Sequence, residues 1–354
     1  MVVNNFFFLR INSNFLNLKL IYHSKNLIQL YIILMNRVDV HAHCLPPSYY
    51  EFLKFLGEKD PDGFPTPTWS VESQIQSMED LHISFSFLSI SSPPVTCNVE
   101  EITAKYVRKI NEEMSSYVKQ YPNKLGFFAI LPLPYINKAL EEIDYCINTL
   151  ECDGFGLPTN YLGKHIGNLE FTPIYQKFQE NKSILCIHPC APLEVPKDID
   201  SNFFPTPAME FFFETTRTVA CIVINNIVSQ YPDIKWIIPH AGACIPIFSD
   251  RWQDFNGMMR MKGHENCDFK RDLAKLYYDL AGMAVPKLLH DLMIDVPVSH
   301  LLYGSDGPYT NLKRMIELER ELDQTNLLND EVREEIYIKN AIQLFPRLSK
   351  IFRK

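Results

Sequence analysis

Several features that mark common protein classes are missing from this 354-residue sequence. It has no cluster of Lys and Arg, and its formal net charge is −8. We therefore do not expect a nucleic acid or an anionic membrane as partner, because both require a clustered basic surface. No C-x-x-C pair occurs among the nine cysteines, most of which lie in apolar segments. This scatter indicates reduced thiols in a cytoplasmic protein rather than a disulfide framework.

Long apolar runs are absent as well, even from the apolar residues 1–34, which contain no acidic side chain. Arg10, Lys19, His23 and Lys25 interrupt this segment before any run reaches the ~18 residues that span a bilayer. No cleavage site of small residues is evident. We predict that residues 1–34 are an extension outside the fold, with a mitochondrial targeting segment as the alternative. Residues 35–354 are predicted to form a single domain.

From Arg37 onward, short apolar runs alternate with longer amphipathic stretches. The runs with the length of β-strands are Val38–His43, Ile83–Ile90, Leu125–Leu131, Gly154–Pro158, Ile184–His188, Trp236–His240, Leu276–Leu280 and Leu301–Gly304. Helical patterns between them include Val71–Leu81, Ile102–Gln120, Asn137–Leu150, Met209–Gln230 and Lys287–Met293. Eight such units predict an α/β protein with a parallel sheet closed into a (β/α)8 TIM barrel. No G-x-G-x-x-G or P-loop sequence follows a strand, which disfavours an open doubly wound sheet.

The first predicted strand carries the strongest chemical signal, Asp39-Val40-His41-Ala42-His43. Side chains alternate along a strand, so Asp39, His41 and His43 share one face. Two neutral imidazoles on that face can both reach one metal ion, and they suit Zn, Mn or Fe. The Pro- and Gly-rich loop Gly57–Ser70 follows and is predicted to cover the mouth of the barrel near the substrate.

Three more polar residues end other strands: His188 the fifth, His240 the sixth and Asp306 the eighth. The C-terminal ends of barrel strands form the face that carries active sites. We predict His41, His43, His188 and Asp306 as the ligands of one divalent ion, most simply zinc with manganese as the alternative. His240 and Asp306 are the candidate acid/base residues. A structural alternative makes His188 and His240 core residues and Asp306 a helix cap.

The fourth predicted strand bears on how many ions the site holds. It ends in Leu157-Pro158-Thr159, without a lysine that could be carbamylated to bridge two ions, so a single ion is expected.

These pieces resemble the amidohydrolase-related family that includes aminocarboxymuconate semialdehyde decarboxylase and the aromatic-acid decarboxylases. The resemblance covers nearly all of residues 37–345 and is closest to the 6-methylsalicylate decarboxylases. The matching segments are VDVHAH at 38–43 with LPP at 45–47, PTPTWS at 65–70, LSISSP at 88–93, CIHP at 186–189, ETTR at 214–217, IPHAG at 238–242 and LYGSD at 302–306. One departure is that resorcylate-type members begin with Glu-x-His, whereas this chain has His41-x-His43.

The resemblance implies an amidohydrolase-type barrel with one divalent metal ion, no organic cofactor and a homodimeric state. It implies non-oxidative decarboxylation of a small aromatic hydroxy acid of the 6-methylsalicylate type, with an aminocarboxymuconate semialdehyde-type acid as the alternative. It also implies that Arg251 reaches the partner subunit's site to hold the substrate carboxylate; a local surface ion pair is the alternative role.

Beside that resemblance, Trp69 is a candidate wall or lid against the ring of the acid, with ordinary loop packing as the alternative. Two other functions stay open at this stage. One is a metal-dependent hydrolase or hydratase on the same barrel, and the other is an inactive binding protein.

Overall fold

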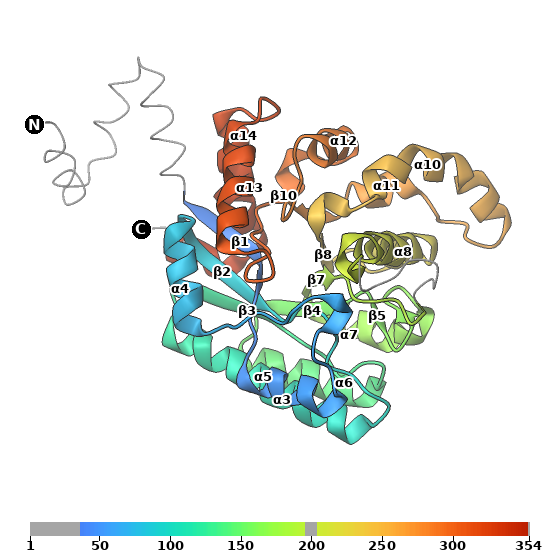
Figure 1. The fold of residues 1–354 in the computed structure, drawn as a ribbon. Helices are drawn as coiled ribbons and strands as arrows, with labels where there is room; N and C mark the ends of the chain where they lie inside the picture. The colour runs from blue at the N-terminus through green and yellow to red at the C-terminus, as the bar shows by residue number, and fades with distance from the viewer. Residues whose placement is uncertain (1–35, 195–203, 353–354) are drawn as a thin grey trace, which may run out of the picture. The chain divides into compact units, whose positions relative to one another are not determined.

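The structure is a computed structural model that describes residues 36–194 and 204–352 (Figure 1). Eight parallel strands form one sheet in the order β1-β2-β3-β4-β7-β8-β9-β10. Their bounds are β1 Arg37–His43, β2 Ile83–Ser89, β3 Leu125–Ala129, β4 Gly154–Pro158, β7 Ile184–His188, β8 Lys235–Ile238, β9 Tyr277–Asp279 and β10 Leu301–Leu302. A separate antiparallel pair consists of β5 Asn160–Tyr161 and β6 Lys164–His165.

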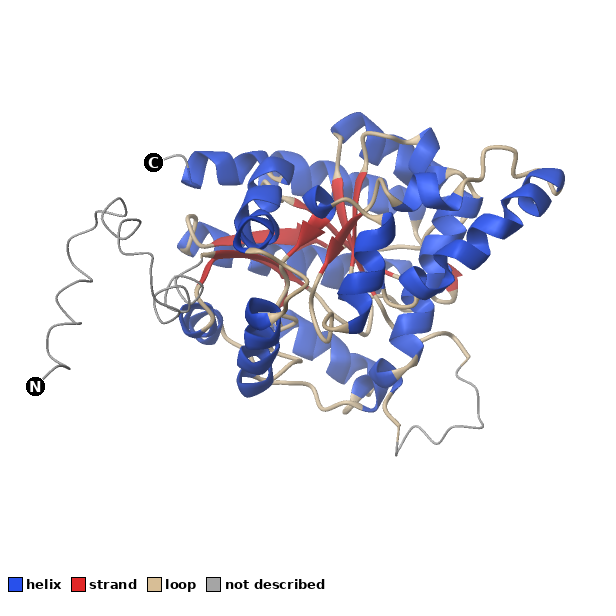
Figure 2. Cartoon of the chain, turned by 90° about the horizontal axis from the view of Figure 1, so that it is seen from above, coloured by secondary structure: helices blue, strands red, loops and turns tan. Residues whose placement is uncertain are grey.

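Helices follow the strands and surround them (Figure 2). The α-helices are α3 Pro47–Leu56, α4 Val71–Asp80, α5 Glu100–Gln120, α6 Ile136–Tyr145, α7 Thr172–Asn181, α8 Glu210–Ile224, α9 Ile227–Gln230, α10 Ile245–Met261, α11 Phe269–Leu273, α12 Lys287–Asp295, α13 Leu312–Gln324, α14 Asp330–Glu334, α15 Asn340–Leu344 and α16 Pro346–Phe352. Short 3-10 turns include η3 Pro61–Gly63, η5 Leu169–Phe171, η6 Thr206–Ala208, η7 His240–Gly242 and η8 Val298–His300, and π-helical turns occur at η4 Cys146–Leu150 and η9 Glu335–Lys339. None of the described helices is long and apolar enough to cross a bilayer.

The segment after β10 joins the last strand to the first. Val40 donates its backbone N–H to the carbonyl of Tyr303 at 3.0 Å, and Asp306 donates to the carbonyl of His41 at 2.8 Å. His43 donates to the carbonyl of Gly307 at 2.7 Å. The sheet is thereby nearly closed, with helices between its strands, and the predicted (β/α)8 barrel is confirmed.

Apolar side chains of the strands form the buried core. Val38 and Val40 are fully buried, in one cluster with Phe87, Phe128 and Ile237. Burying a side chain of this size contributes roughly 1.5–3 kcal/mol, so the cluster stabilises the packing of the strands that contribute to it. All nine cysteines are free thiols, in agreement with the sequence.

Several predicted elements end earlier than their apolar patterns suggest, and for two of them the backbone shows why. The sixth strand stops at Ile238 rather than His240 because Pro239 has no N–H to donate to a neighbouring strand. The helix predicted over 209–230 is divided into α8 and α9, since Asn226 adopts a left-handed φ of 59° between them. The extension predicted at 1–34 lies outside the described residues.

The loop predicted at Gly57–Ser70 has defined ends. Gly57 closes α3 in a left-handed conformation with φ 77°, which glycine adopts without steric cost. Ser70 begins α4 with a capping box, in which its hydroxyl accepts from the N–H of Ser73 and the Ser73 hydroxyl accepts in return. Between these anchors the chain forms η3 at Pro61–Gly63.

Candidate metal centre

Four side chains meet at the C-terminal ends of β1 and β7 and just after β10. They are His41, His43, His188 and Asp306, and one potential ligand atom of each lies within 4.8 Å of the others. Nε2 of His41 and Nε2 of His43 are 3.1 Å apart. Oδ1 of Asp306 lies 3.2 Å from Nε2 of His43 and 3.4 Å from Nε2 of His41. Residues far apart in the chain are thus gathered at one point of the barrel.

Hydrogen bonds determine which nitrogen of each β1 imidazole faces this cluster. Nδ1 of His41 donates to Oδ2 of Asp279 at 2.9 Å. The hydroxyl of Ser89 donates to the carbonyl of Ala42 at 3.1 Å, so its oxygen accepts from Nδ1 of His43 at 3.0 Å. Both rings therefore carry a proton on Nδ1 and direct the lone pair of Nε2 into the cluster.

This arrangement fits a divalent metal ion. For bonds of about 2.0–2.1 Å, neighbouring ligands of a tetrahedral ion are about 3.3 Å apart. The separations among His41, His43 and Asp306 are 3.1 to 3.4 Å. Nδ1 of His188 is buried and has no hydrogen-bond partner among the described residues. A cation would satisfy such an atom, and would also separate lone pairs that otherwise repel one another.

The pKa values of the four side chains are shifted by burial and by their charged neighbours. Burial lowers the pKa of His43 and lowers that of His188 well below its usual range. Burial alone would lower the pKa of His41, but the Asp279 carboxylate raises it well above the usual value. Burial alone would raise the pKa of Asp306, but hydrogen bonds from the surrounding histidines lower it well below its usual range. An ion bound here would displace the Nε2 proton that the carboxylates favour on His41, and would then meet three neutral imidazoles and an ionised carboxylate, a donor set that zinc and manganese accept.

Asp279, at the end of β9, is a site residue that the sequence analysis missed. Its side chain is fully buried. Oδ2 holds Nδ1 of His41, while Oδ1 accepts the N–H of His240 at 3.0 Å and the N–H of Ala281 at 3.1 Å. Asp279 thus orients a candidate ligand and also fixes the backbone that carries His240. The available signal was a carboxylate at the end of the apolar run Leu276–Leu280.

We expect Asp279→Asn to lower metal affinity by about 10- to 100-fold, because the amide cannot replace the charged acceptor that holds His41. Titration of the metal-free variant with Zn²⁺ and Mn²⁺ measures the change. Asp80→Asn, the same substitution at an exposed end of α4, is the matched control. Equal metal affinities in the variant, the control and the unmodified protein would show that Asp279 does not contribute to metal binding.

Three hydrogen bonds hold the loop that carries Asp306. Asp39 accepts the hydroxyl of Ser305 at 2.6 Å and its N–H at 3.0 Å, which ties β1 to this loop. The hydroxyl of Thr310 donates to Oδ2 of Asp306 at 3.1 Å, and leaves Oδ1 facing the histidines. The carboxylate is therefore oriented from both sides before any ligand binds.

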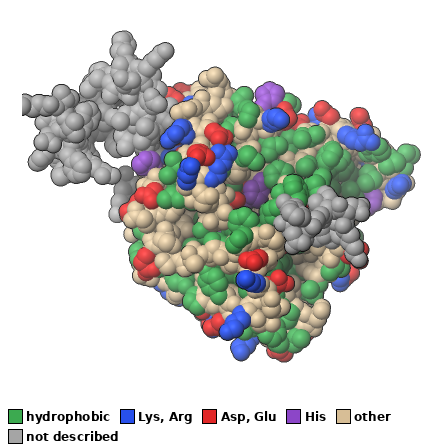
Figure 3. Space-filling view, in the orientation of Figure 1, with side chains coloured by type: hydrophobic (Ala, Val, Ile, Leu, Met, Phe, Trp, Pro, Cys, Tyr) green, Lys and Arg blue, Asp and Glu red, His purple; other side chains and the backbone are tan. Residues whose placement is uncertain are grey.

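A cavity of about 320 Å³ adjoins the cluster, and its walls are mainly apolar. It is lined by Pro61, Asp62, Phe64, Ser91, Ser92, His188, Pro207, Phe211, Phe212, His240, Ala281, Gly282, Met283, Leu288, Asp306, Tyr309, Thr310, Arg314 and Leu318. Figure 3 shows histidine surface among hydrophobic side chains near the middle of the visible face. The loop at Gly57–Ser70 contributes to this lining, as predicted from its position after the first strand. A cavity of this size accommodates a single-ring acid.

His240 lines this cavity and is separate from the four clustered side chains. Its ring stacks on Phe212 with centroids 5.9 Å apart and an angle of 14°. Nε2 of His240 lies 3.9 Å from Oδ2 of Asp306. The imidazole and the carboxylate therefore face the same space, where either can exchange a proton with a bound acid.

Trp69 and Arg251 lie away from the cavity. Trp69 packs edge to face on Tyr117, with centroids 5.2 Å apart, and is not among the described residues that line the cavity. The indole therefore packs against α5 rather than in the cavity wall, and a contact with a substrate ring stays a prediction. Arg251 is exposed on α10, with its guanidinium 5.6 Å from the ring centroid of Phe255. Within one subunit it does not line the cavity either.

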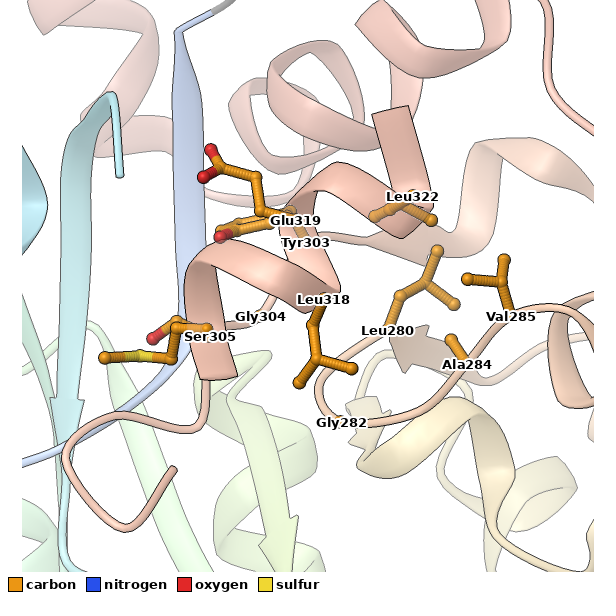
Figure 4. A pocket seen from close by; sticks show the side chains of 11 residues that line it. Leu280, Gly282, Ala284, Val285, Tyr303, Gly304, Ser305, Leu318, Glu319 and Leu322 are labelled. Atoms are coloured by element: carbon orange, nitrogen blue, oxygen red, sulfur yellow. The ribbon is translucent and has the colours of Figure 1, made fainter. Parts of the chain in front are cut away.

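A second, much smaller cavity of about 20 Å³ lies between α13 and the segments after β9 and β10 (Figure 4). Glu319 lines it and pairs with the buried Arg37 at 2.7 Å. Burial, with a smaller contribution from the nearby Asp323 carboxylate, raises the pKa of Glu319 to about 7 despite the opposing charge of Arg37. The folded protein therefore holds this proton more tightly than the unfolded chain does.

We expect the unfolding free energy to fall as pH rises from about 4.5 to about 7, because the unfolded chain loses the Glu319 proton first. Glu319→Gln has no proton to lose, so its unfolding free energy does not change in this way. Relative to the unmodified protein, the unfolding free energy of the variant should therefore rise by up to about 3 kcal/mol between pH 5 and pH 8. Urea unfolding at both pH values measures it, with the exposed Glu321→Gln as control. The same difference between the variant and the unmodified protein at both pH values would contradict the expectation.

Comparisons with known proteins agree with this geometry. The family model described as amidohydrolase matches residues 38–347. The 6-methylsalicylic acid decarboxylase of Penicillium expansum is 28% identical over 326 residues, which cover 90% of this chain and 99% of that protein. A solved amidohydrolase II structure is 36% identical, with a TM-score of 0.83 and coverage of 87% of this chain and 99% of the other. The 5-carboxyvanillate decarboxylase of Novosphingobium aromaticivorans, solved with manganese and a nitrobenzoic acid, is 16% identical with a TM-score of 0.78, over 88% of this chain and 96% of that chain. The chain belongs to the amidohydrolase family.

Proposed function

We propose that this chain is a metal-dependent carboxy-lyase that removes CO2 from a small aromatic hydroxy acid of the 6-methylsalicylate type and releases a phenol. The observation that carries the proposal is the convergence of three imidazoles and a carboxylate beside an apolar cavity of about 320 Å³. The relative from Penicillium expansum, which aligns over nearly its whole length, supports the substrate class.

His41, His43, His188 and Asp306 would hold one divalent ion, zinc or manganese. Manganese has support from the relative solved with that ion. When bound, the ion supplies a Lewis acid that stabilises negative charge on the carboxylate and the neighbouring phenolic oxygen of the acid. Asp279, Ser89 and Thr310 orient the ligands through the hydrogen bonds described above.

The reaction requires a proton on the ring carbon that bears the carboxylate. Protonation there allows the bond to the carboxylate carbon to break, and its electron pair restores the aromatic ring as CO2 leaves. His240 and Asp306 face the cavity together, with 3.9 Å between Nε2 and Oδ2. A proton held on the imidazole can pass through the carboxylate to the ring. Phe211 and Phe212 supply apolar surface for the ring and exclude water from it.

A panel of hydroxybenzoic acids tests this function. Metal-free protein is reconstituted with Zn²⁺ or Mn²⁺ and offered salicylate, 6-methylsalicylate and dihydroxybenzoates, and the products are identified by mass. Release of labelled CO2 with the matching phenol supports the proposal. Turnover of lactones or enoic acids without CO2 would instead make the chain a hydrolase or hydratase, and failure to bind a divalent ion would overturn any metal-dependent reaction.

We also propose that the chain forms a homodimer in which Arg251 of one subunit holds the carboxylate of an acid bound by the other. Helix α10, which carries Arg251, extends away from the barrel (Figure 1). Its side chains Ile247, Phe255 and Met261 are 65%, 41% and 83% exposed, so they offer apolar surface to a second copy. A cytoplasmic location stays a prediction.

Arg251→Ala is expected to raise the KM for the acid about tenfold or more, because a planar guanidinium can clamp a carboxylate through two hydrogen bonds. Lys262→Ala, at the end of the same helix, is the control. Co-expression of Arg251→Ala with a second variant that lacks a metal ligand decides whether Arg251 acts across subunits. If it does, a mixed dimer contains one intact site, with the metal ligands of one subunit and Arg251 of the other, whereas neither homodimer contains any. A monomer in solution, or an unchanged KM, would contradict the role.

A further inference from the structure

The cavity beside the metal centre is larger than a single-ring acid requires. Its volume of about 320 Å³ is roughly twice the ~150 Å³ of an apolar cavity that holds one benzene ring. Space for a second ring is therefore left over. The carboxylate, the hydroxyl group and one methyl group of a 6-methylsalicylate fill only part of it.

Helix α13 shows in which direction this space extends. Thr310, Arg314 and Leu318 all line the cavity, at intervals of four residues. Residues four apart lie on the same face of a helix and about 6 Å apart along its axis, so Arg314 and Leu318 form a row on α13. The row continues from Thr310, whose hydroxyl holds Asp306. The cavity therefore runs from the metal centre along one face of α13.

The segment between β9 and α12 forms the facing wall. Gly282 and Leu318 line both the large and the small cavity, so this segment lies against α13 here (Figure 4). Met283 and Leu288 follow Gly282 in the chain and also line the large cavity. Met283 is 69% exposed, which places the outer end of this space at the protein surface. We call the part lined by Met283, Leu288 and Leu318 the α13 arm.

The one cationic group beside the α13 arm does not make it a site for an anion. NH1 of Arg314 donates to Glu317 and to Glu321, at 3.1 Å in both cases. Two carboxylates thus outweigh the charge of one guanidinium, and a second anionic group on the acid would meet net negative charge. The hydrocarbon stem of Arg314 can lie along the apolar wall, as the stems of long cationic side chains commonly do. The chemical group that matches the arm is therefore a hydrocarbon chain.

We propose that the α13 arm binds an alkyl chain, so that the preferred substrates are 2-hydroxybenzoic acids that carry a chain longer than methyl at position 6. The arm begins beside Asp306, so a substituent next to the bound carboxylate can enter it. Each methylene group that leaves water for this wall favours binding. This inference rests on the proposed decarboxylase function and specifies its substrate.

The test compares 2-hydroxybenzoic acids with a methyl, propyl or pentyl group at position 6. Burial of one methylene group changes an equilibrium by about fourfold, so kcat/KM of the manganese-loaded protein should be about tenfold or more higher for the propyl acid than for the methyl acid. Leu318→Trp and Leu288→Trp fill the arm and should each lower this ratio to about one or below. Leu312→Trp, at an exposed position of α13 outside the cavity lining, is the matched control and should keep the ratio of the unmodified protein.

The outcomes separate the α13 arm from the reaction. Release of CO2 decides whether the chain is a decarboxylase, whereas the ratio between chain lengths decides what the arm binds. If no acid releases CO2, calorimetric titration of the manganese-loaded protein with the same acids still gives the ratio as a ratio of affinities. A methyl acid that is used or bound as well as the propyl and pentyl acids would overturn the inference. A preference for longer chains that persists in both Leu318→Trp and Leu288→Trp would also overturn it, because the chain would then lie elsewhere.

Discussion

His43→Ala is expected to abolish stoichiometric metal binding and to lower kcat/KM for decarboxylation by at least about 10³-fold. Nε2 of His43 is the atom closest to two other potential ligands, at 3.1 Å from His41 and 3.2 Å from Asp306. Its ring is fully buried and is oriented by the hydroxyl of Ser89, so this side chain is held in the position of a ligand. Without His43, only three potential ligands remain to bind the ion.

Elemental analysis and CO2 release measure the two effects, and thermal unfolding supplies a third readout. A metal that binds only the folded protein raises its melting temperature, so adding Zn²⁺ or Mn²⁺ should stabilise the unmodified protein and leave His43→Ala nearly unchanged. His290→Ala, at an exposed histidine on α12, is the matched control and should respond like the unmodified protein. A His43→Ala protein that keeps one ion per chain would show that the ion binds elsewhere.

The sequence was informative wherever a polar residue ends an apolar run. His41, His43, His188 and Asp306 were chosen for that reason, and the structure brings potential ligand atoms of all four within 4.8 Å. The barrel followed from the same runs, because eight apolar strands separated by helices have few other ways to bury their surfaces. Both inferences depend on periodicity and position, which the chain carries locally.

Asp279 carried the same local signal, a carboxylate near the end of an apolar run, but its role comes from a contact that the run does not reveal. It lies 238 positions after His41, and the sequence does not say which imidazole it meets. The exposure of Arg251 and the packing of Trp69 on Tyr117 likewise depend on tertiary structure. Trp69 lies in a loop whose residues 61, 62 and 64 line the cavity, but its own side chain packs on Tyr117, a contact that its position in the loop does not reveal.

Local backbone conformation also lies beyond sequence patterns. His240 and Asp306 both have left-handed φ angles, of 55° and 60°. Non-glycine residues adopt this region rarely, and only where surrounding contacts hold them there. The N–H of His240 is bound to Asp279, and the N–H of Asp306 is bound to the carbonyl of His41. The two candidate acid/base residues are thus positioned by His41 and by Asp279, the residue that orients His41.

Asp306→Asn and His240→Asn are each expected to lower kcat by about 10²- to 10⁴-fold, the range of general acid catalysis. If the imidazole passes its proton through the carboxylate, the two act as one unit and the double variant should be little slower than the slower single variant. Asparagine keeps the shape of Asp306 and an oxygen toward the histidines, so metal content should fall less than turnover does. The measurement is a double-mutant cycle on kcat with the metal content of each protein determined.

Additive losses in that cycle would show that the two residues act in separate steps. A large loss for Asp306→Asn with a small loss for His240→Asn would assign the proton to the carboxylate alone and leave His240 to bind the acid. Its stacking on Phe212 and its place in the cavity wall permit that second role, which would raise KM rather than lower kcat. The 3.9 Å between Nε2 of His240 and Oδ2 of Asp306 favours the coupled result, because a small movement on substrate binding brings the two atoms within hydrogen-bond distance.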